Sequence, residues 1–463
     1  RVFFLSRSLS VCRRCLAQHT MAAFLVLILQ CLTAVCDWIL QFNHRVFFWL
    51  LLLFTALFYS CVASAIAFAA GFLAWIASMK RHPRPLAKYQ GPLDLLLGRS
   101  NRASTLTPDM PANNNVSIAS YGDELVLAYR KAETHFASAS ARIIVATSKN
   151  LEDWTVVWTH STGQDDLREV FLWEFKGRIF LNFASLEPYK RGFRSKGMHW
   201  TSTTDLKVWS DPVSMGRDTE ITWDIKVREE DSGAVAYKVG YIGNHYAADA
   251  LLTVVFESST DGETWKPVGS DIGVYTGGIC EVSFAFTSKG DLVAIGRNED
   301  GDHSGFGTQL FFAHRDSLGS WTPLKISLPY RFDSPRLVMM EGELVLFARY
   351  AQEVYGCAPK WFPMLMQRAI NLIMYSARPK SAAAYHLCLP DPECAWPKEP
   401  IQIIRFFEEC YGDTGFFSVA KFGSSGEWAV ANYASDCHSH ASWFYGQLIP
   451  TDVYVCRCVP IRR

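Results

Sequence analysis

The chain has 463 residues, enough for more than one domain, and its 45 basic and 45 acidic side chains leave no net charge. Such a balance provides no overall field to attract nucleic acid, so none is expected as a partner. P-loop, Rossmann and paired CxxC patterns are missing from the positions where they would have meaning. The sequence therefore predicts neither a cofactor nor a metal site.

The N-terminal region differs from the rest of the chain in its hydrophobicity. The long stretch 46–79 contains no charged side chain. About 20 apolar residues suffice to cross a bilayer, so this stretch predicts a transmembrane helix. Residues 21–40 are a weaker second candidate, interrupted by Gln30 and Asp37. We therefore expect a membrane protein with an N-terminal membrane segment, residues 1–79, and a lipid bilayer as a partner.

The basic residues around this segment leave its orientation open. Lys80, Arg81 and Arg84 follow it, and the positive-inside rule would keep that side in the cytosol. Arg13, Arg14 and Arg45 lie before it and oppose that assignment. Residues 80–110 contain prolines and arginines, and we expect them to form a linker.

Tryptophans then recur at nearly constant spacing. Trp154, Trp209, Trp265 and Trp321 follow one another at almost equal intervals along the chain. Each ends a short polar segment that follows a β-rich run; the segments read SKNLEDW, TTDLKVW, STDGETW and RDSLGSW. A repeat of this length in a β-rich chain is typical of propeller blades.

Glycines between β-like runs give a second estimate of the repeat number. Glycine tolerates the positive φ that tight hairpins need, so each of these residues predicts a hairpin. They are Gly122, Gly177, Gly233, Gly290, Gly342 and Gly426. The first five are nearly evenly spaced and the last follows after a longer interval. This pattern predicts an all-β, six-bladed β-propeller over residues 111–463, with an insertion in the fifth blade.

Acidic residues gather where each blade's first strand should begin. That strand lines the central channel of a propeller, so these carboxylates should converge there. Converging carboxylates beside arginines can have divergent pKa values and supply an acid and a base. The predicted catalytic residues are Glu281, Glu169, Asp166 and Asp413. Arg168, Arg336 and Trp223, from the same segments, are expected to bind substrate. The alternative interpretation is a polar, water-filled channel with ion pairs.

Three arginines lie seven or eight residues after their hairpin glycines, at matching positions in three blades. They are Arg130, Arg297 and Arg349, and Tyr433 takes this place in the last blade. A planar guanidinium suits a carboxylate, so the three arginines predict an anion site; separate salt bridges are the alternative. His135 and His245 lie in loops after second strands and are further candidates for sugar contact or proton donation.

The Ser/Thr-x-Asp-x-x-x-Trp repeat resembles the Asp-box (BNR repeat) of the sialidase superfamily, whose members are propellers. Segment 280–297 followed by 316–321 is similar to a sialidase blade, in which a Glu opens the first strand and an Arg closes the second. The resemblance implies that Glu281 activates a nucleophile and that Arg297 binds a substrate carboxylate. It covers the whole predicted propeller at the level of architecture, and its specific motifs cover far less.

The sequence also departs from that family. Residues 113–117 read NNNVS where sialidases carry Arg-Ile-Pro, and Phe416 and Phe417 stand where their nucleophilic Tyr is expected. Two functions therefore stay open beside a membrane-anchored sialidase-like hydrolase of glycans. One is a non-catalytic glycan- or protein-binding propeller. The other is a furanosidase-type glycosidase with a pair of carboxylates, which needs no tyrosine.

Overall fold

The computed structural model describes most of the chain after residue 91. The described residues are 70–71, 92–104, 110–187, 194–243, 251–302, 305–324, 331–351, 362–377, 380–387, 401–406, 412–423, 426–435 and 442–462. Two compact units, Arg1–Arg84 and Pro85–Arg463, make up the chain. The predicted membrane spans, 46–79 and 21–40, lie outside the described residues except for Ala70 and Gly71. Within the described residues, no helix has both the length and the apolar character needed to cross a membrane.

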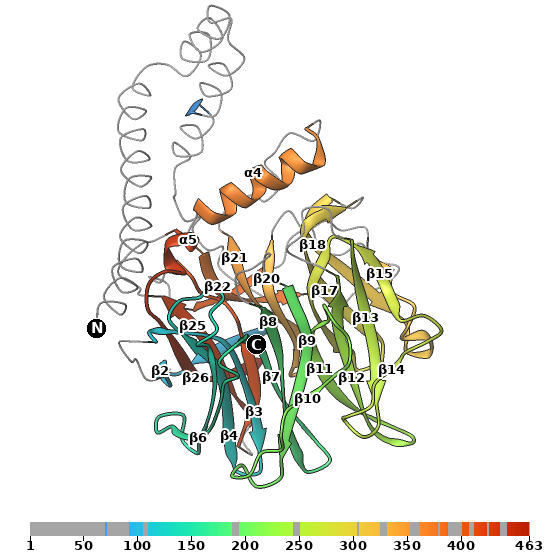
Figure 1. Ribbon diagram of the computed structural model, residues 1–463. Helices are drawn as coiled ribbons and strands as arrows, with labels where there is room; N and C mark the ends of the chain where they lie inside the picture. Colours follow the sequence, from blue (N-terminus) through green and yellow to red (C-terminus); the bar gives the residue numbers. More distant parts are fainter. Residues whose placement is uncertain are drawn as a thin grey trace, which may run out of the picture. The chain divides into compact units, whose positions relative to one another are not determined.

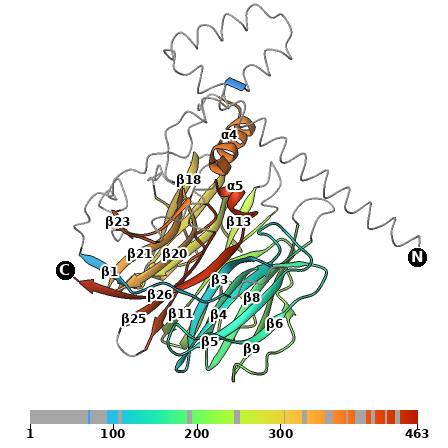
Figure 2. The ribbon, with the colours of Figure 1, turned by 90° about the vertical axis from the view of Figure 1, so that its left-hand side faces the viewer.

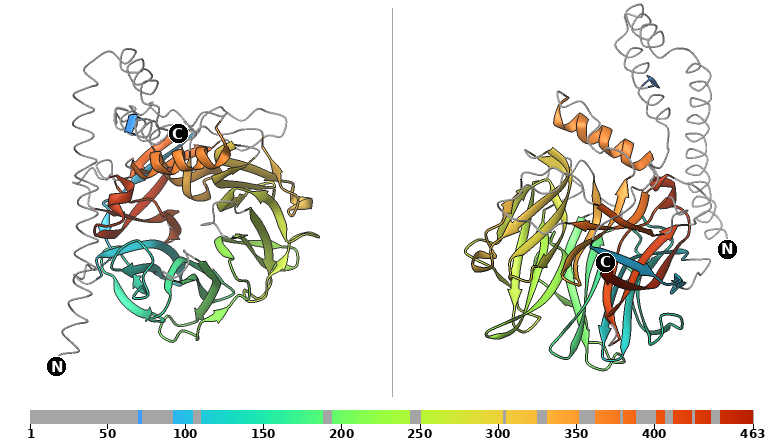
Figure 3. Two further views of the ribbon diagram at one scale, coloured as in Figure 1. Left: turned by 45° about the horizontal axis from the view of Figure 1, so that its top comes forward. Right: turned by 180° about the vertical axis from the view of Figure 1, so that it is seen from behind.

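The second unit is an all-β propeller. Figure 3 shows its sheets arranged radially around one axis, and the labelled strands can be followed in Figure 1. Four sheets are separate antiparallel meanders. Their strands are β7 (Asp166–Phe175), β8 (Arg178–Glu187), β9 (Arg194–Thr203), β10 (Val213–Ser214); β11 (Ile221–Glu230), β12 (Gly233–Ile242), β13 (Leu252–Ser259), β14 (Lys266–Pro267), with β15 (Gly273–Gly277) beside β13; β16 (Ile279–Phe286), β17 (Leu292–Asp302), β18 (Gly305–Ala313), β19 (Thr322–Pro323); and β20 (Phe332–Met340), β21 (Glu343–Ala351), β22 (Lys380–Leu387), β23 (Ile401–Phe406).

The fifth sheet has nine strands and consists of two meanders. One contains β3 (Ala112–Tyr121), β4 (Glu124–Ala132), β5 (Arg142–Ser148) and β6 (Thr155–His160); the other contains β24 (Ser418–Phe422), β25 (Glu427–Ser435) and β26 (Thr451–Arg462). A parallel pairing of Thr451 with Ala112 joins them. This contact between the first and last meanders closes the ring of sheets.

The last meander takes strands from the beginning of the unit. β1 (Leu93–Leu97) pairs with β26 along its whole length, and β2 (Asn101–Arg102) pairs with the same strand. Figure 2 shows β1 beside β26, near the C-terminus. Residues 80–110 were predicted to be a linker, but part of this stretch is thus sheet. The alternation in β1 explains the pairing, because Leu93 and Leu95 are buried against the core around Trp428.

The six glycines of the predicted hairpins lie as expected. Five of them occupy the turn between the first two strands of a meander, and Gly233 directly follows such a turn as the first residue of β12; their φ angles range from 61° to 104°. Gly122, Gly177, Gly233 and Gly426 have no atoms near the position of a Cβ. At these four turns glycine is therefore required by the backbone conformation and not by lack of space.

The tryptophan repeats form the turns between third and fourth strands. In three of them an Asn or Asp oxygen accepts two backbone N–H groups, as Asp261 does from Glu263 at 2.8 Å and Thr264 at 2.7 Å. Asn150 and Asp205 make the equivalent bonds. The indoles of all four turns pack against the buried cores of the meanders. The repeat is therefore a turn that the side chains stabilise and that the core anchors.

Two helices complete the unit. α4 (Met364–Ala377) lies in the insertion between β21 and β22, and the short α5 (Trp443–Gly446) precedes β26. Between the sheets, adjacent meanders share apolar cores such as the cluster of Val126 and Val145 with Leu172 and Leu181. This packing of one sheet on the next is what fixes the positions of the residues near the axis.

Candidate functional site

A bulge near the beginning of the opening strand sets the direction of side chains in several meanders. The pairing register shifts after Asn114 in β3, after Arg168 in β7 and after Asp333 in β20. The next residue in each has positive φ: Asn115 at 49°, Glu169 at 53° and Ser334 at 48°. Non-glycine residues rarely adopt this conformation. Bulges of this kind re-aim side chains next to functional sites, which makes the axial ends of these strands the candidate site.

Glu169 and Glu281 each belong to a bulge of an opening strand, but they take different positions within the two bulges. Glu169 is the first of two residues in β7 that the register shift leaves without a partner in β8. Glu281 is the second of the two corresponding residues in β16. The two glutamates therefore occupy bulge positions that differ by one residue in register.

The Glu281 carboxylate is held by two donors. Arg297 Nη1 donates to Oε1 at 2.6 Å, and the backbone N–H of Ser334 donates to Oε2 at 2.7 Å. Its side chain is 13% exposed. Both oxygens of the Glu281 side chain thus have a donor, and the two bonds fix the position of the carboxyl group.

Glu169 has a different environment. Asn115 Nδ2 lies 3.4 Å from its Oε2, a long hydrogen bond. Burial raises the pKa of Glu169 to about 7; Arg168 opposes the shift and the charge of Glu281 adds to it. Two neighbouring carboxyl groups thus have contrasting environments, which is the arrangement that supplies one acid and one base near neutral pH.

Arg297 binds three carboxylates of the protein itself. Besides Glu281, its guanidinium lies 2.5 Å from Glu299 and 2.8 Å from Asp333. Arg331 binds the same two acids, at 2.6 Å from Glu299. Coulombic attraction to these acids raises the pKa of Arg297 well above its usual value despite burial. The sequence reasoning missed Arg331 and Glu299, although Arg331 lies only two residues before Asp333.

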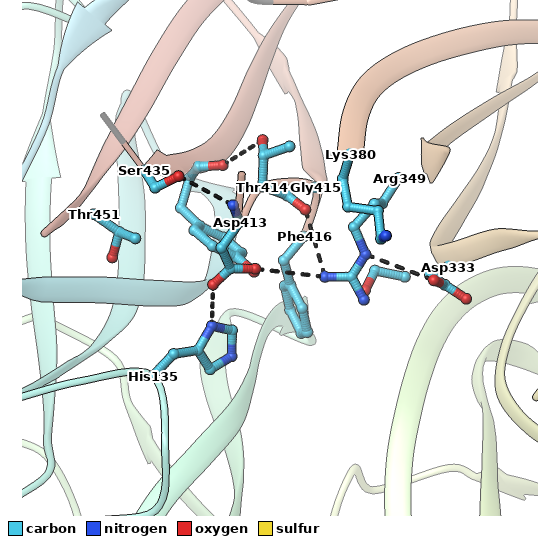
Figure 4. Close-up of polar contacts among 12 residues, drawn as sticks. His135, Asp333, Arg349, Lys380, Asp413, Thr414, Gly415, Phe416, Ser435 and Thr451 are labelled. Carbon is cyan, nitrogen blue, oxygen red and sulfur yellow. Dashed lines mark hydrogen bonds and ion pairs between the residues drawn. The ribbon is translucent and has the colours of Figure 1, made fainter. Parts of the chain in front are cut away.

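Arg349 lies between two acids at longer range. Its Nε is 3.7 Å from Asp333 and its Nη1 is 3.9 Å from Asp413. Nη1 also donates to the carbonyl oxygen of Thr414 at 3.4 Å. Figure 4 shows the guanidinium between Asp413 and Asp333, beside Lys380. Arg297 and Arg349 are therefore brought together through Asp333.

Arg130 is instead occupied by Asp166. Its Nε and Nη2 bind the two carboxylate oxygens at 2.9 and 2.7 Å, and both side chains are fully buried. Arg168 binds the same carboxylate at 2.9 Å. Burial would raise the pKa of Asp166, but Arg168 and Arg130 lower it more strongly, so the net shift is downward. This ionised, enclosed carboxylate has the environment of a structural group.

Asp413 organises a second group, drawn in Figure 4. His135 Nδ1 contacts Asp413 Oδ2, and the Tyr433 hydroxyl donates to Oδ1 at 2.8 Å. The Ser435 hydroxyl accepts the backbone N–H of Asp413 at 3.0 Å. Burial lowers the pKa of His135 and outweighs the opposing effect of Asp413. Tyr433 therefore serves as a support for Asp413, with its own pKa raised by burial.

Arg336 and Trp223 lie in the packed interior. Arg336 donates to the carbonyl oxygens of Trp223 and Phe417, the latter at 3.1 Å. Its guanidinium lies 5.0 Å from the Phe171 ring, 5.1 Å from Trp223 and 5.8 Å from Phe416. These partners come from different meanders, so the stack ties the meanders together. Phe416, at the expected tyrosine position, is part of it.

Two further expectations can be compared with the described residues. His245 lies outside them, in 244–250. Among the described residues, no three His, Cys, Asp or Glu side chains are grouped so that they could hold a metal ion. The residues that do converge are carboxylates, arginines, His135 and Tyr433.

Known proteins offer a comparison of the fold. No family model matches this chain, and no curated protein sequence matches it. A Trypanosoma rangeli sialidase bound to 2,3-difluoro-KDN is a similar solved structure, with 12% identity over 77% of this chain and a TM-score of 0.47. This chain spans 58% of that sialidase.

Two other similar structures are glycoside hydrolases. A Penicillium chrysogenum α-L-arabinanase complexed with arabinobiose matches 78% of this chain and 98% of its own, with 12% identity and a TM-score of 0.45. A family 117 glycoside hydrolase from Zobellia galactanivorans matches 59% of this chain and 87% of its own, with 13% identity and a TM-score of 0.37. At such identities the likeness concerns the fold and not the activity.

Proposed function

We propose that this chain is a glycoside hydrolase built on a six-bladed propeller, with Glu169 as general acid and Glu281 as base or nucleophile. The observation that carries this proposal is the contrast between the two bulge carboxyl groups. Glu281 is held by Arg297 and the Ser334 N–H, whereas Glu169 has one long hydrogen bond. Glycosidases need one protonated and one ionised carboxyl group at neutral pH. The six glycine hairpins support the blade count.

The charges around the site favour a neutral sugar over a sialoside. A sialic acid carboxylate would need arginines that the protein does not neutralise. Here Arg297 binds three protein carboxylates, and Arg130 is enclosed with Asp166. The site therefore fits the carboxylate-pair type of glycosidase better than the sialidase type. In that mechanism the leaving oxygen takes its proton from Glu169.

Membrane anchoring is a separate part of the proposal. It rests on the uncharged stretch of residues 46–79. The glycosidase proposal does not depend on it.

Hydrolysis of fluorogenic glycosides by the full chain tests the proposal. The panel contains neutral pyranosides and furanosides and one α-sialoside. We expect release from a neutral sugar, and Glu281→Gln and Glu169→Gln to lower kcat/KM by about 10²–10⁴-fold. Glu263→Gln is the control, because that carboxylate is 43% exposed in an ion pair with Arg178.

Each outcome decides between functions. Release from the sialoside alone would show that the arginines accept a substrate carboxylate, and would replace the neutral-sugar proposal. Full activity in Glu281→Gln would remove this residue from the mechanism. Binding on a glycan array without hydrolysis of any substrate would make the chain a glycan-binding propeller.

A further inference from the structure

The inner face of α4 carries polar side chains into the propeller. Asn371 and Tyr375 lie one helical turn apart, on the same face, and are 2% and 3% exposed. The Tyr375 ring packs edge-on against Trp443 of α5, with their centroids 4.9 Å apart. The insertion helix and α5 therefore meet at Tyr375 and Trp443.

Several buried polar atoms at this junction have no hydrogen-bond partner in the described part of the chain. They are Asn371 Nδ2 and Oδ1, the Tyr375 hydroxyl and Trp443 Nε1. Arg349 belongs to the junction because its guanidinium lies 5.8 Å from the Trp443 ring. A buried polar atom without a partner costs about 1–3 kcal/mol, so a group of them at one junction requires an explanation.

The surroundings of these atoms carry more positive than negative charge, because Asp333, the carboxylate that acts on Tyr375, is itself bound by Arg297, Arg331 and Arg349. Lys380 Nζ lies 3.6 Å from the Tyr375 ring centre and 5.9 Å from that of Trp443. Arg331 lies 3.9 Å from the Tyr375 ring centre. Figure 4 shows Lys380 beside Arg349. A cation would be repelled here, whereas an anion would meet positive charge on several sides.

The unpartnered atoms are mostly donors. The Trp443 indole N–H can only donate, the Tyr375 hydroxyl can donate, and Asn371 offers an amide NH₂. A water molecule could satisfy two donors at most, since it accepts two hydrogen bonds, whereas a halide can accept from all three. We propose that this junction binds a small inorganic anion of chloride size, held by Asn371, Tyr375 and Trp443 beside the Arg349 guanidinium.

The site is distinct from the proposed catalytic carboxylates. Tyr375 and Asn371 come from the insertion, whereas Glu169 and Glu281 lie on β7 and β16. A bound anion would link α4 and α5 to β21, because Arg349 lies on β21. Its expected effect is therefore to hold α4 on the propeller and to stabilise the folded chain.

Thermal unfolding of the full chain tests this site without any substrate. We would measure Tm in sodium chloride and in sodium gluconate at equal ionic strength, since gluconate is too large to be enclosed. A higher Tm in chloride, rising with the logarithm of its concentration, is the expected result. Equal Tm values in the two salts would overturn the proposal and indicate water at the junction.

Variants then locate the site. Trp443→Phe removes one donor and should lower the chloride-dependent Tm shift, and Asn371→Leu should do the same if Trp443→Phe does not fold. Trp209→Phe is the matched control, since Trp209 Nε1 is also buried without a partner among the described residues, on the turn between β9 and β10. An unchanged shift in both junction variants would contradict the assignment. Glu281→Gln should retain the shift, which separates this inference from the glycosidase proposal.

Discussion

Arg130 and Asp166 form a two-pronged ion pair in which both side chains are fully buried. The same guanidinium donates to the carbonyl oxygens of Thr134 at 3.0 Å and Phe136 at 2.9 Å. These two residues flank His135, so the pair also fixes the loop that presents the histidine to Asp413. Arg130, which was predicted to bind substrate, therefore holds the loop of His135 in place beside Asp413.

Removing one partner of this pair should be severely destabilising. Arg130→Met leaves Asp166 buried with Arg168 as its remaining cation, so we expect a loss of about 3–5 kcal/mol in the free energy of unfolding. Urea unfolding followed by tryptophan fluorescence measures it. Arg102→Met is the control: Arg102 is 45% exposed in its pair with Asp452, so its loss should be below about 1 kcal/mol. Equal losses in the two variants would contradict this account.

The raised pKa of Glu169 gives a signed pH prediction. Burial raises the pKa of Glu169 to about 7, above the pKa of the same group in the unfolded chain. At any pH between these two pKa values, the native state therefore holds more protons than the unfolded chain. Stability contributed by the protonated group is therefore complete at low pH and is lost as pH rises through 7. We expect the unfolding free energy of the wild-type chain to fall over this range, and that of Glu169→Gln to fall less. Urea unfolding at a series of pH values measures both, and parallel curves would contradict the assignment.

The same titration should shape the activity. If Glu169 is the acid, kcat/KM on a neutral glycoside falls above about pH 7 as its proton is lost. A pH–rate profile measures this limb. Full activity at pH well above this value would contradict the role of Glu169 as acid while leaving the stability prediction intact.

Local rules made the repeated turns predictable. The hairpin glycines and the turns ending in Trp154, Trp209, Trp265 and Trp321 follow from backbone conformation and short-range hydrogen bonds, which sequence spacing reveals. The matching positions of Arg130, Arg297 and Arg349 predicted one shared anion site; in the structure Arg297 and Arg349 both approach Asp333. The pairing of Arg130 with Asp166 did not, because spacing shows where an arginine lies and not which acid it meets.

The residues that were missed have no counterpart in the repeat. Tyr375 and Asn371 come from the insertion, whose helix carries none of the spacing that marks the blades. Lys380 follows it at the start of β22. Arg331 and Glu299 lie just outside the positions compared between blades. The register of the bulges makes Glu169 the first and Glu281 the second unpaired residue of its strand. This register depends on how each strand pairs with its neighbour, which the sequence spacing does not show.

A final prediction concerns the glycine next to this site. Gly415 has φ of 93°, and a Cβ there would lie 2.4 Å from the Cβ of Arg349. Gly415→Ala should therefore displace Arg349 away from Asp413, in addition to the cost of about 1–2 kcal/mol for a side chain in this conformation. Gly426→Ala is the matched control, with φ of 73° and open space around a Cβ. Thermal unfolding should show the larger loss of Tm in Gly415→Ala, together with a smaller chloride-dependent shift, because the Arg349 guanidinium places positive charge beside Trp443 at the anion site. Similar losses in both variants would mean that β21 yields to the added methyl group.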